Sequence, residues 1–591
     1  MSLFFVSFFL SSKELIDTTL SSRYLGVFGV LLIGFIALAK RVKAYLQTEI
    51  RWLDVLLLAF CLWQVLSIFW ATNSAEAFAS SFRSVALFLA YLFLRVLVVS
   101  DERWKRYLPL TVSLASSVYL LVLWIELFSV TSDIGLNAQS IYLLRYPTET
   151  KNLTSIILLI SMAFHLQDLL QNQGWKRWFS IVNMVLMLGT LFLFSTRGIS
   201  LSILAIGGAI LLLQMFWKRH RFKHAVAIGL GLILLGTSHW FASNKFKTEA
   251  AKAYSKTEEV AAQEPDEESA EHAYRSANER VSLWSKTLGL IKQDPILGVG
   301  AGNWQIEYPR IGLDGLERAQ FRTTSFKRPH NEVLSVLCET GIIGLILFVL
   351  VLLRFFQNGL NASKTDLPFV AAMVGLITAS MFDFPRERME HNLLFAVMLA
   401  LTVSEQPMAE LKKKSAQLVH IGLVIMCAFG MLVFGFRYHG ERNYDKLRIL
   451  KAQQKYSECI RYADKVENPF YTVDWINYPI AWFVGVCYSY QGQFAEGERE
   501  FERALELNPG NFHTHNNLGF CLAQQEKYSI AVPFFESCLA INSKFEEARF
   551  NLAFSLIKMN KFDAATETLS VHVTDTAKKD IYLAEIEKLK L

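Results

Sequence analysis

Residues 328–353 read RPHNEVLSVLCETGIIGLILFVLVLL, a polar head followed by an apolar run over 333–353. A run of this kind is close to the roughly 20 residues that cross the hydrocarbon core of a bilayer as a helix. The head contains three charged or titratable side chains, Arg328, His330 and Glu332. The stretch therefore predicts a membrane helix that begins in a polar cluster at one surface of the bilayer.

Further apolar runs extend this prediction over the first 436 residues. The chain has 591 residues, of which 52% are hydrophobic and 19% charged, a composition too apolar for a soluble protein of this length. We predict an all-α membrane helix bundle of about twelve spans, because several runs are slightly short for an untilted crossing. The runs are 24–39, 52–70, 83–99, 107–128, 153–169, 178–195, 199–217, 225–242, 333–353, 367–383, 391–404 and 418–436.

Basic residues occupy every second connection between these runs, which the positive-inside rule assigns to the cytoplasm. They are Lys40, Arg41, Lys43 and Arg51; Arg103, Lys105 and Arg106; Lys176 and Arg177; Lys218, Arg219, Arg221 and Lys223; Arg354 and Lys364; and Lys412, Lys413 and Lys414. The turn at Arg197, the loop 243–332, the turn 384–390 and everything after 437 are then outside.

After residue 437 the membrane pattern gives way to a repeat. Gly485, Gly519 and Ala553 are 34 residues apart, the tetratricopeptide period, in which a small residue lets two antiparallel helices approach. We predict two domains, a membrane core over 1–436 with the outside loop 243–332, and an α-solenoid of tetratricopeptide repeats over 437–591. Such arrays usually bind peptides or partner proteins. The same period joins Trp482, Asn516 and Phe550; Phe494, Tyr528 and Phe562; and Phe501, Phe535 and Leu569.

Two outside motifs precede the polar head. In Ser195-Thr196-Arg197-Gly198 the arginine sits between two apolar runs, where it either extends to lipid headgroups or serves a function. The second motif runs from Arg280 through Trp284 to PILGVGAGNW at 295–304. Its glycines do not form a nucleotide-binding loop, because asparagine replaces the third glycine of GxGxxG and no βαβ pattern surrounds them. We interpret the segment as a glycine-rich turn that leads back to the membrane.

The polar head itself is the third outside motif. A lone histidine at a membrane surface is usually only a hydrogen-bonding residue. His330 differs because two arginine-bearing segments lie on its side of the membrane and the long outside loop can cover it. These neighbours favour a functional role.

At this point the chain resembles a known family. The STRG motif, the Arg280 to 303 segment, RPHNEVLSVLCETGIIGL and the FDFP motif at 382–385 are similar to successive motifs of the O-antigen ligase and polymerase superfamily. The resemblance covers residues 20–436. It implies a GT-C type, metal-independent glycosyltransferase with no cofactor, in the bacterial inner membrane with the C-terminal domain in the periplasm. Such an enzyme moves a glycan from undecaprenyl diphosphate to an acceptor hydroxyl on lipid A core, on another glycan or on a protein.

The resemblance also implies roles for particular residues. Arg197 and Arg280 would grip the diphosphate, because guanidinium groups stabilise a leaving phosphate bidentately. His330, with a pKa near neutrality, would act as general base on the acceptor hydroxyl or orient it. The expected substrate-binding residues are Arg328, Asn331, Arg386 and Arg388, with contact to lipid headgroups as the alternative for the last two.

Other classes of function fit less well. The basic residues follow the membrane topology, so nucleic acid is not an expected partner, whereas membrane lipids and a protein bound to the repeats are. The seven cysteines form no CxxC pair, and no metal site can be identified. A transporter would place ionisable residues near the bilayer midplane and often has two repeated halves. In this chain the charged residues lie mostly at the span boundaries, and no halves repeat. A non-enzymatic scaffold remains the alternative, and it would tolerate loss of His330 and Arg197.

Overall fold

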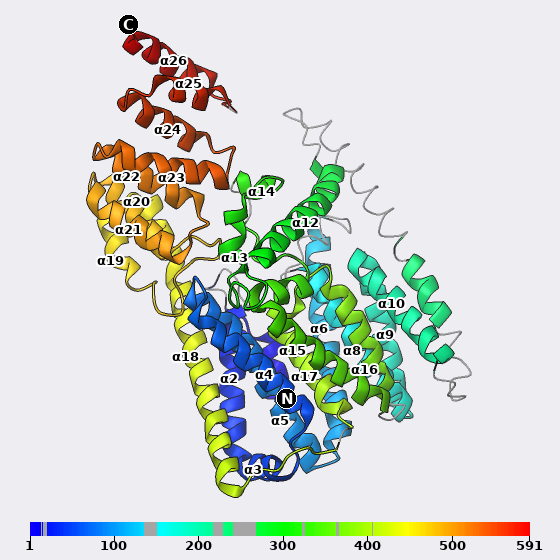
Figure 1. Cartoon of the computed structure of the whole chain (residues 1–591). Helices are drawn as coiled ribbons and strands as arrows, with labels where there is room; N and C mark the ends of the chain where they lie inside the picture. Colours follow the sequence, from blue (N-terminus) through cyan, green and yellow to red (C-terminus); the bar gives the residue numbers. More distant parts are fainter. Residues whose placement is uncertain are drawn as a thin grey trace.

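The structure is a computed structural model in which all regular secondary structure of the described residues is helical (Figure 1). It describes residues 1–12, 15, 20–134, 150–194, 196–216, 229–238, 240, 268–321, 325–361, 366–404, 406–571 and 573–590. Several residues named above lie outside these ranges: Ser195, Lys218, Arg219, Arg221, Lys223 and Lys364.

Within the described residues, eight helices are long and apolar enough to cross a membrane. They are α2 (Leu20–Ala37), α4 (Trp52–Leu66) with the 3-10 turn η1 (Ser67–Phe69), α5 (Ser74–Ser100), α6 (Trp104–Ile134), α8 (Lys151–Gln171), α9 (Trp175–Phe194), α15 (Glu332–Asn361) and α18 (Lys413–Ala452). The remaining predicted runs form shorter apolar helices: α10 (Arg197–Phe216), Gly229–Ser238, α16 (Leu367–Ser380) and α17 (Met389–Thr402). The predicted all-α membrane bundle is confirmed; eight of the described helices qualify as spans, against about twelve predicted.

Helix α5 lies at the centre of the bundle. Of its most apolar 18-residue window, 89% is buried, and it packs against α2, α4, α17 and α18. Small residues such as Ala86 and Ala90 are fully buried and allow this close packing. The helix begins at a cap in which the Asn73 side chain accepts the backbone N–H of Glu76 at 3.1 Å. The first turns of α5 therefore hold polar side chains in fixed positions at one end of the bundle.

Connections that carry basic residues meet at the other end. The backbone N–H of Met408 donates to the carbonyl of Ile50 at 2.8 Å, which joins two of the predicted cytoplasmic loops. Arg41 in α3 (Ala39–Thr48) donates to Ser100, the last residue of α5, at 3.4 Å. The opposite end of the bundle carries the repeats and the helices of the predicted outside loop, α12 (Glu268–Gln293), α13 (Trp304–Glu307) and α14 (Glu317–Gln320) (Figure 1).

The last membrane helix continues without a break into the repeats. Helix α18 has 40 residues, so the predicted boundary at 436 lies inside it (Figure 1). The apolar pattern stops there because the helix leaves the lipid, although its hydrogen-bonded turns continue. The following helices are α19 (Tyr456–Ala463), α20 (Ile480–Tyr490), α21 (Phe494–Leu507), α22 (Phe512–Gln524), α23 (Tyr528–Ile541), α24 (Glu546–Lys558), α25 (Phe562–Ser570) and α26 (Thr576–Lys590).

The small residues of the 34-residue period act as predicted. A Cβ atom on Gly485 would lie 2.8 Å from the ring of Phe501, and one on Gly519 would lie 2.7 Å from the ring of Phe535. Both distances are too short for a carbon contact, so glycine is what lets the paired helices approach. The predicted tetratricopeptide solenoid is confirmed.

The repeats also pack on the outside helices. Leu283 of α12, Trp304 of α13 and Leu316 beside α14 are buried in one hydrophobic cluster with Phe512 and Leu518 of α22. Apolar surface shared in this way fixes two elements relative to each other more firmly than a polar surface contact does. The array is therefore packed directly onto the loop that carries the candidate site.

Candidate active site

The glycine-rich segment pairs with a break in the helix that follows the polar head. Helix α15 is interrupted at Gly341, whose backbone has φ 63° and ψ −171°. The N–H groups of Val299 and Gly300 donate to the carbonyls of Cys338 and Glu339, both at 2.9 Å. These bonds satisfy carbonyls that the break would otherwise leave unpaired. The two motifs thus form one structural unit that fixes the first half of α15.

Glycines are required for this contact. Gly298, Gly300 and Gly302 have φ values of 73°, 95° and 72°, a region that side chains disfavour. A Cβ atom on Gly298 would lie 2.6 Å from the carbonyl oxygen of Cys338, and one on Gly302 would lie 2.6 Å from that of Glu76. The segment is therefore a turn in close backbone contact with the membrane helices, as predicted.

His330 is held immediately before α15. Its backbone has φ 54°, an unusual value for a residue with a side chain. The indole of Trp284 donates to the carbonyl of Pro329 at 2.8 Å, and the His330 ring packs edge-on against Phe384 at 5.1 Å. Asn331 caps α15, since its Oδ1 accepts the N–H of Leu334 at 3.0 Å. The predicted substrate-binding side chain of Asn331 is thus engaged in capping.

The imidazole of His330 is neutral at physiological pH. Burial, together with the charges of Arg280 and Arg318, lowers its pKa to about 3, well below the expected value near neutrality. Its Nδ1 atom is buried and has no hydrogen-bond partner among the described residues. A neutral ring with an unused nitrogen can accept a hydrogen bond from a substrate hydroxyl.

The other two predicted catalytic residues lie within electrostatic range of His330 or of each other. Arg280 on α12 is half-buried. Burial lowers the pKa of its guanidinium, the Asp383 carboxylate raises it in part, and the charge of Arg197 lowers it further. Arg197 is the first residue of α10, is exposed, and has its guanidinium 5.9 Å from the ring centroid of Trp240. The fold therefore brings Arg197, Arg280 and His330 together from three separate segments.

Asp383 of the FDFP motif belongs to the same group, although the sequence did not identify it as a site residue. Burial raises its pKa to about 6 against the opposing charge of Arg280. One of its oxygens accepts the N–H of Phe384 at 3.1 Å. An acidic residue inside a motif otherwise made of Phe and Pro was the only available signal.

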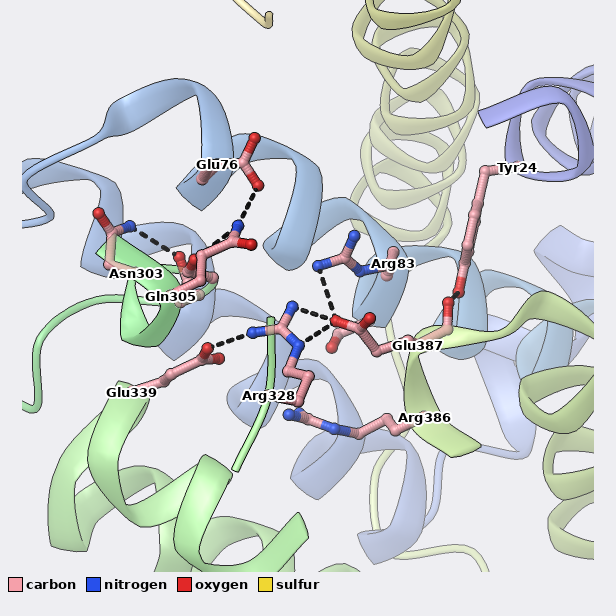
Figure 2. Close-up of polar contacts among 12 residues, drawn as sticks. Tyr24, Glu76, Arg83, Asn303, Gln305, Arg328, Glu339, Arg386 and Glu387 are labelled. Carbon is pink, nitrogen blue, oxygen red and sulfur yellow. Dashed lines mark hydrogen bonds and ion pairs between the residues drawn. The ribbon is translucent and has the colours of Figure 1, made fainter. Parts of the chain in front are cut away.

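A second cluster of arginines surrounds Glu387 (Figure 2). Arg328 donates to Glu387 and, at 2.5 Å, to Glu339, and Arg83 Nη2 lies 3.4 Å from Glu387 Oε1. Although burial alone would lower the pKa of Arg328, the two carboxylates raise it. The same arginines lower the pKa of Glu387 to about 2 in spite of burial. The predicted substrate-binding residue Arg328 is here part of an ion network.

The cluster lines a narrow polar cleft at the start of α5 and α15. Arg83 had no sequence signal, because it opens an apolar run and resembles a residue at a span boundary. Arg386, another predicted substrate-binding residue, donates from Nε to Glu332 at 3.1 Å. The cleft is lined by Ser80, Arg83, Ser84, Arg328, Glu332, Ser335, Arg386 and Glu387.

An apolar pocket adjoins this cleft between α15, α16 and α17. Arg386 and Glu332 line both spaces, so they mark the place where the polar cleft meets the apolar pocket. Arg388, the last predicted substrate-binding residue, is buried at the start of α17, and its charge helps to lower the pKa of Glu387. The remaining lining includes Val333, Phe348, Leu352, Met373, Leu376, Ile377, Ser380, Pro385, His391, Asn392 and Phe395.

Comparison with protein families assigns two parts of the chain. Residues 182–349 match the O-antigen ligase family, and residues 479–511 and 522–585 match tetratricopeptide repeat families. The chain carries an O-antigen ligase domain followed by tetratricopeptide repeats. The ligase match begins in α9 and ends in α15, so it contains Arg197, Arg280 and His330. With the apolar helices it identifies a multi-pass bacterial membrane protein, and such a domain implies a lipid-linked glycan and an acceptor as substrates.

Comparison with solved structures adds only weak similarities. Two structures of MamA, labelled MSR-1 and AMB-1, are 22% and 23% identical to this chain, each covers 26% of it and 86% of the MamA chain, and their TM-scores are 0.23 and 0.22. A crystal structure of the APC/C hetero-tetramer Cut9-Hcn1 covers 84% of this chain and 91% of its own at 13% identity and a TM-score of 0.24. No curated protein matches the chain.

The described residues include no group of three or more His, Cys, Asp or Glu placed to hold a metal ion. The charged groups near His330 are the guanidinium groups of Arg197, Arg280 and Arg318 and the carboxyl of Asp383. This arrangement supplies fixed positive charge and a neutral hydrogen-bond acceptor. Those are the two elements that transfer of a group from a diphosphate to a hydroxyl requires.

Proposed function

We propose that this protein transfers a glycan from an undecaprenyl diphosphate carrier to an acceptor hydroxyl at the periplasmic face of the inner membrane, without a metal ion. The observation that carries the proposal is the meeting of Arg197, Arg280 and His330, which come from separate segments and act electrostatically within one site. The O-antigen ligase match over the same residues supports it.

The two adjoining spaces suit a lipid with an anionic head. The apolar lining of the pocket between α15, α16 and α17 suits the first isoprene units of a polyprenyl chain, whereas a diphosphate needs cationic donors. Arg386 lies where the pocket meets the polar cleft, and its guanidinium stands 6.0 Å from the ring centroid of Phe60. We place the lipid-proximal part of the carrier there.

The chemistry follows from the charges. The acceptor oxygen attacks the anomeric carbon, the bond from that carbon to the diphosphate oxygen breaks, and negative charge grows on the diphosphate. Arg197 and Arg280 stabilise this charge because their positions are fixed before reaction. A bound diphosphate also favours the protonated form of His330, so its pKa rises from about 3 when the donor is present. His330 then accepts the hydroxyl proton as the new bond forms.

The repeats favour a protein at the acceptor side, either as acceptor or as a partner that delivers it. The core motifs do not distinguish lipid A core, a growing glycan and a protein, since each presents a hydroxyl to the same base. Repeats of this family indicate protein interactions. A protein O-oligosaccharyltransferase and an O-antigen polymerase are therefore the alternatives within the same chemistry.

The proposal is tested with purified full-length protein and undecaprenyl diphosphate-linked glycan isolated from the host. Release of undecaprenyl diphosphate should depend on an added acceptor and persist in excess chelator. Activity that disappears in chelator and returns with Mg²⁺ or Mn²⁺ would contradict metal independence. Glycan profiling of a deletion strain identifies the acceptor, and unchanged profiles of lipid A, polymer length and glycoproteins would support a scaffold instead.

A further inference from the structure

A turn of the repeat array is hydrogen-bonded to the predicted outside loop shortly before His330. This array turn, residues 541–544, joins α23 to α24. The N–H of Leu313 donates to the carbonyl of Ile541 at 2.7 Å, and the side chain of Asn542 donates to the carbonyl of Gln320 at 3.0 Å. Asn542 is fully buried and Gln320 nearly so. The turn therefore fixes α14 by hydrogen bonds that water does not reach.

The equivalent turn one repeat earlier uses its asparagine differently. Asn508 stands 34 residues before Asn542, and its side-chain amide donates to the carbonyl of Asn477 inside the array at 2.7 Å. At Asn542 a carbonyl of the outside loop accepts this bond instead. The loop is thus attached through a position that the repeats elsewhere use for their own cohesion.

From α14 the contacts continue to α12. Arg318 donates from Nε to both oxygens of Glu279, at 2.9 and 2.9 Å, and a second guanidinium nitrogen bonds the same carboxylate. Glu279 is only 5% exposed, so the pair is more than a solvated surface contact. Glu279 directly precedes Arg280 on α12. The position of Arg280 is therefore linked to the array turn through one ion pair and the short helix α14.

The same elements reach His330. Trp284, just over one turn after Arg280 on α12, donates to the carbonyl of Pro329, and the charge of Arg318 lowers the pKa of His330. Both the cation that would bind the diphosphate and the histidine that would accept the proton thus depend on where α12 and α14 lie. A displacement of about 1 Å at such a site can cost on the order of 100-fold in rate.

We propose that Glu279 and Arg318 are positioning residues, and that with Asn542 they make the repeat array part of the support of the catalytic site. The repeats then do more than recruit a partner, because their turn at 541–544 holds α14, and α14 holds α12 through the Arg318–Glu279 pair. The measurement of glycan transfer rests on the proposed function. The measurement of hydrogen exchange tests the inference independently of that function.

The first arm measures hydrogen exchange of the full-length protein in lipid nanodiscs. Glu279→Gln, Arg318→Gln and Asn542→Ala should each raise exchange in α12 and in peptides spanning 325–331. Arg503→Gln is the matched control, because the Arg503–Glu467 pair, at 3.0 Å with Arg503 46% exposed, resembles the Arg318 pair but lies inside the array. Unchanged exchange in α12 for the three variants, or an equal rise in the control, overturns the proposal even if the protein transfers no glycan.

The second arm measures transfer from undecaprenyl diphosphate-linked glycan of the host. Glu279→Gln and Arg318→Gln should each lower kcat by roughly 10-fold to 100-fold while the donor KM changes by less than about threefold. The double variant should have a kcat no lower than that of the less active single variant, since both substitutions remove the same contact. Losses that multiply, or that fall on KM alone, contradict positioning. If wild-type protein is inactive the proposed function fails, and the exchange arm still decides this inference.

Discussion

His330 combines a strained backbone with a ring that the fold keeps uncharged. Burial and the charges of Arg280 and Arg318 lower its pKa to about 3, so the neutral ring is a poor base. Under the proposed function, a bound diphosphate would bring negative charge beside Arg280 and favour the imidazolium, so His330 would be a better base with the donor in place.

Substitution of the two arginines and substitution of the histidine should affect different steps of transfer. Arg197→Ala and Arg280→Ala should each lower transfer by about 10² to 10³, the usual cost of removing one donor to a developing anion. His330→Ala should leave binding of the lipid-linked donor intact and damage the transfer step. Donor binding and single-turnover rates of the purified variants distinguish these cases. Arg499→Ala, on a residue 73% exposed in the array, is the control, and full activity of His330→Ala would refute its role.

Asp383 should make the protein less stable at high pH. Its pKa in the folded protein, about 6, lies above the usual value of 3.8, so the folded state binds the proton more tightly. Its contribution to stability is complete below about pH 4 and is lost as the pH rises through 6. Asp383→Asn removes this loss and should raise the unfolding free energy at pH 8 by at most about 3 kcal/mol, with little effect at pH 4. Thermal unfolding at both pH values measures this. A stability gain of equal size at both would show that the carboxylate charge is not the cause.

At the scale of elements, the glycine-rich turn and the broken helix α15 form a single device. The turn supplies backbone donors to the carbonyls before Gly341. The break at Gly341 sets the direction of the first half of α15, which carries the polar head of the candidate site. Three glycines with positive φ make the approach feasible. The device explains why two motifs about 40 residues apart in sequence act together.

Gly298→Ala should disturb this device specifically. The new Cβ would lie 2.6 Å from the carbonyl oxygen of Cys338 at a backbone φ of 73°, so the turn must move or the helix break must change. We expect a loss of stability of about 2 kcal/mol or more and a larger loss of transfer. Gly422→Ala in α18 meets nothing within 4 Å and should be neutral. Equal melting temperatures and activities for both variants would argue against the device.

These elements show where prediction from sequence succeeds and where it stops. Hydropathy predicts the spans and the 34-residue period predicts the repeats, because both patterns depend only on residues close together in the sequence. The contact of Gly300 with Glu339 and the pairing of Arg83 with Glu387 join distant segments, and no local pattern encodes them. The domain boundary was placed at 436 because hydropathy ends there, whereas the helix does not. The neighbouring motifs indicate His330, but its low pKa depends on burial and on the charges of Arg280 and Arg318, which only folding brings near.

At the scale of the whole molecule, the membrane bundle and the repeats are joined by a continuous helix and by side-chain contacts. Helix α18 links them covalently as one continuous helix, and the outside helices share a hydrophobic cluster with the array. A buried ion pair adds to this, since Arg437 of α18 lies 2.8 Å from Glu76 at the start of α5. Arg437 and Glu76 are each almost fully buried, so removing Arg437 would leave the Glu76 carboxylate buried without its ion-pair partner. A partner bound to the repeats is therefore held at a fixed place relative to the site.

The same continuity gives a prediction for topology. A helix of 40 residues is about 60 Å long at 1.5 Å per residue, roughly twice the thickness of the hydrocarbon core, so α18 crosses once and half of it projects beyond. Its first end follows Lys412 and lies beside the loop at Ile50, which the positive-inside rule assigns to the cytoplasm. The repeats and the site at the other end should then be periplasmic. Alkaline phosphatase fused after Lys590 should be active and a fusion at Ala409 silent. The reverse pattern would invert the molecule and place the ligase site on the cytoplasmic face.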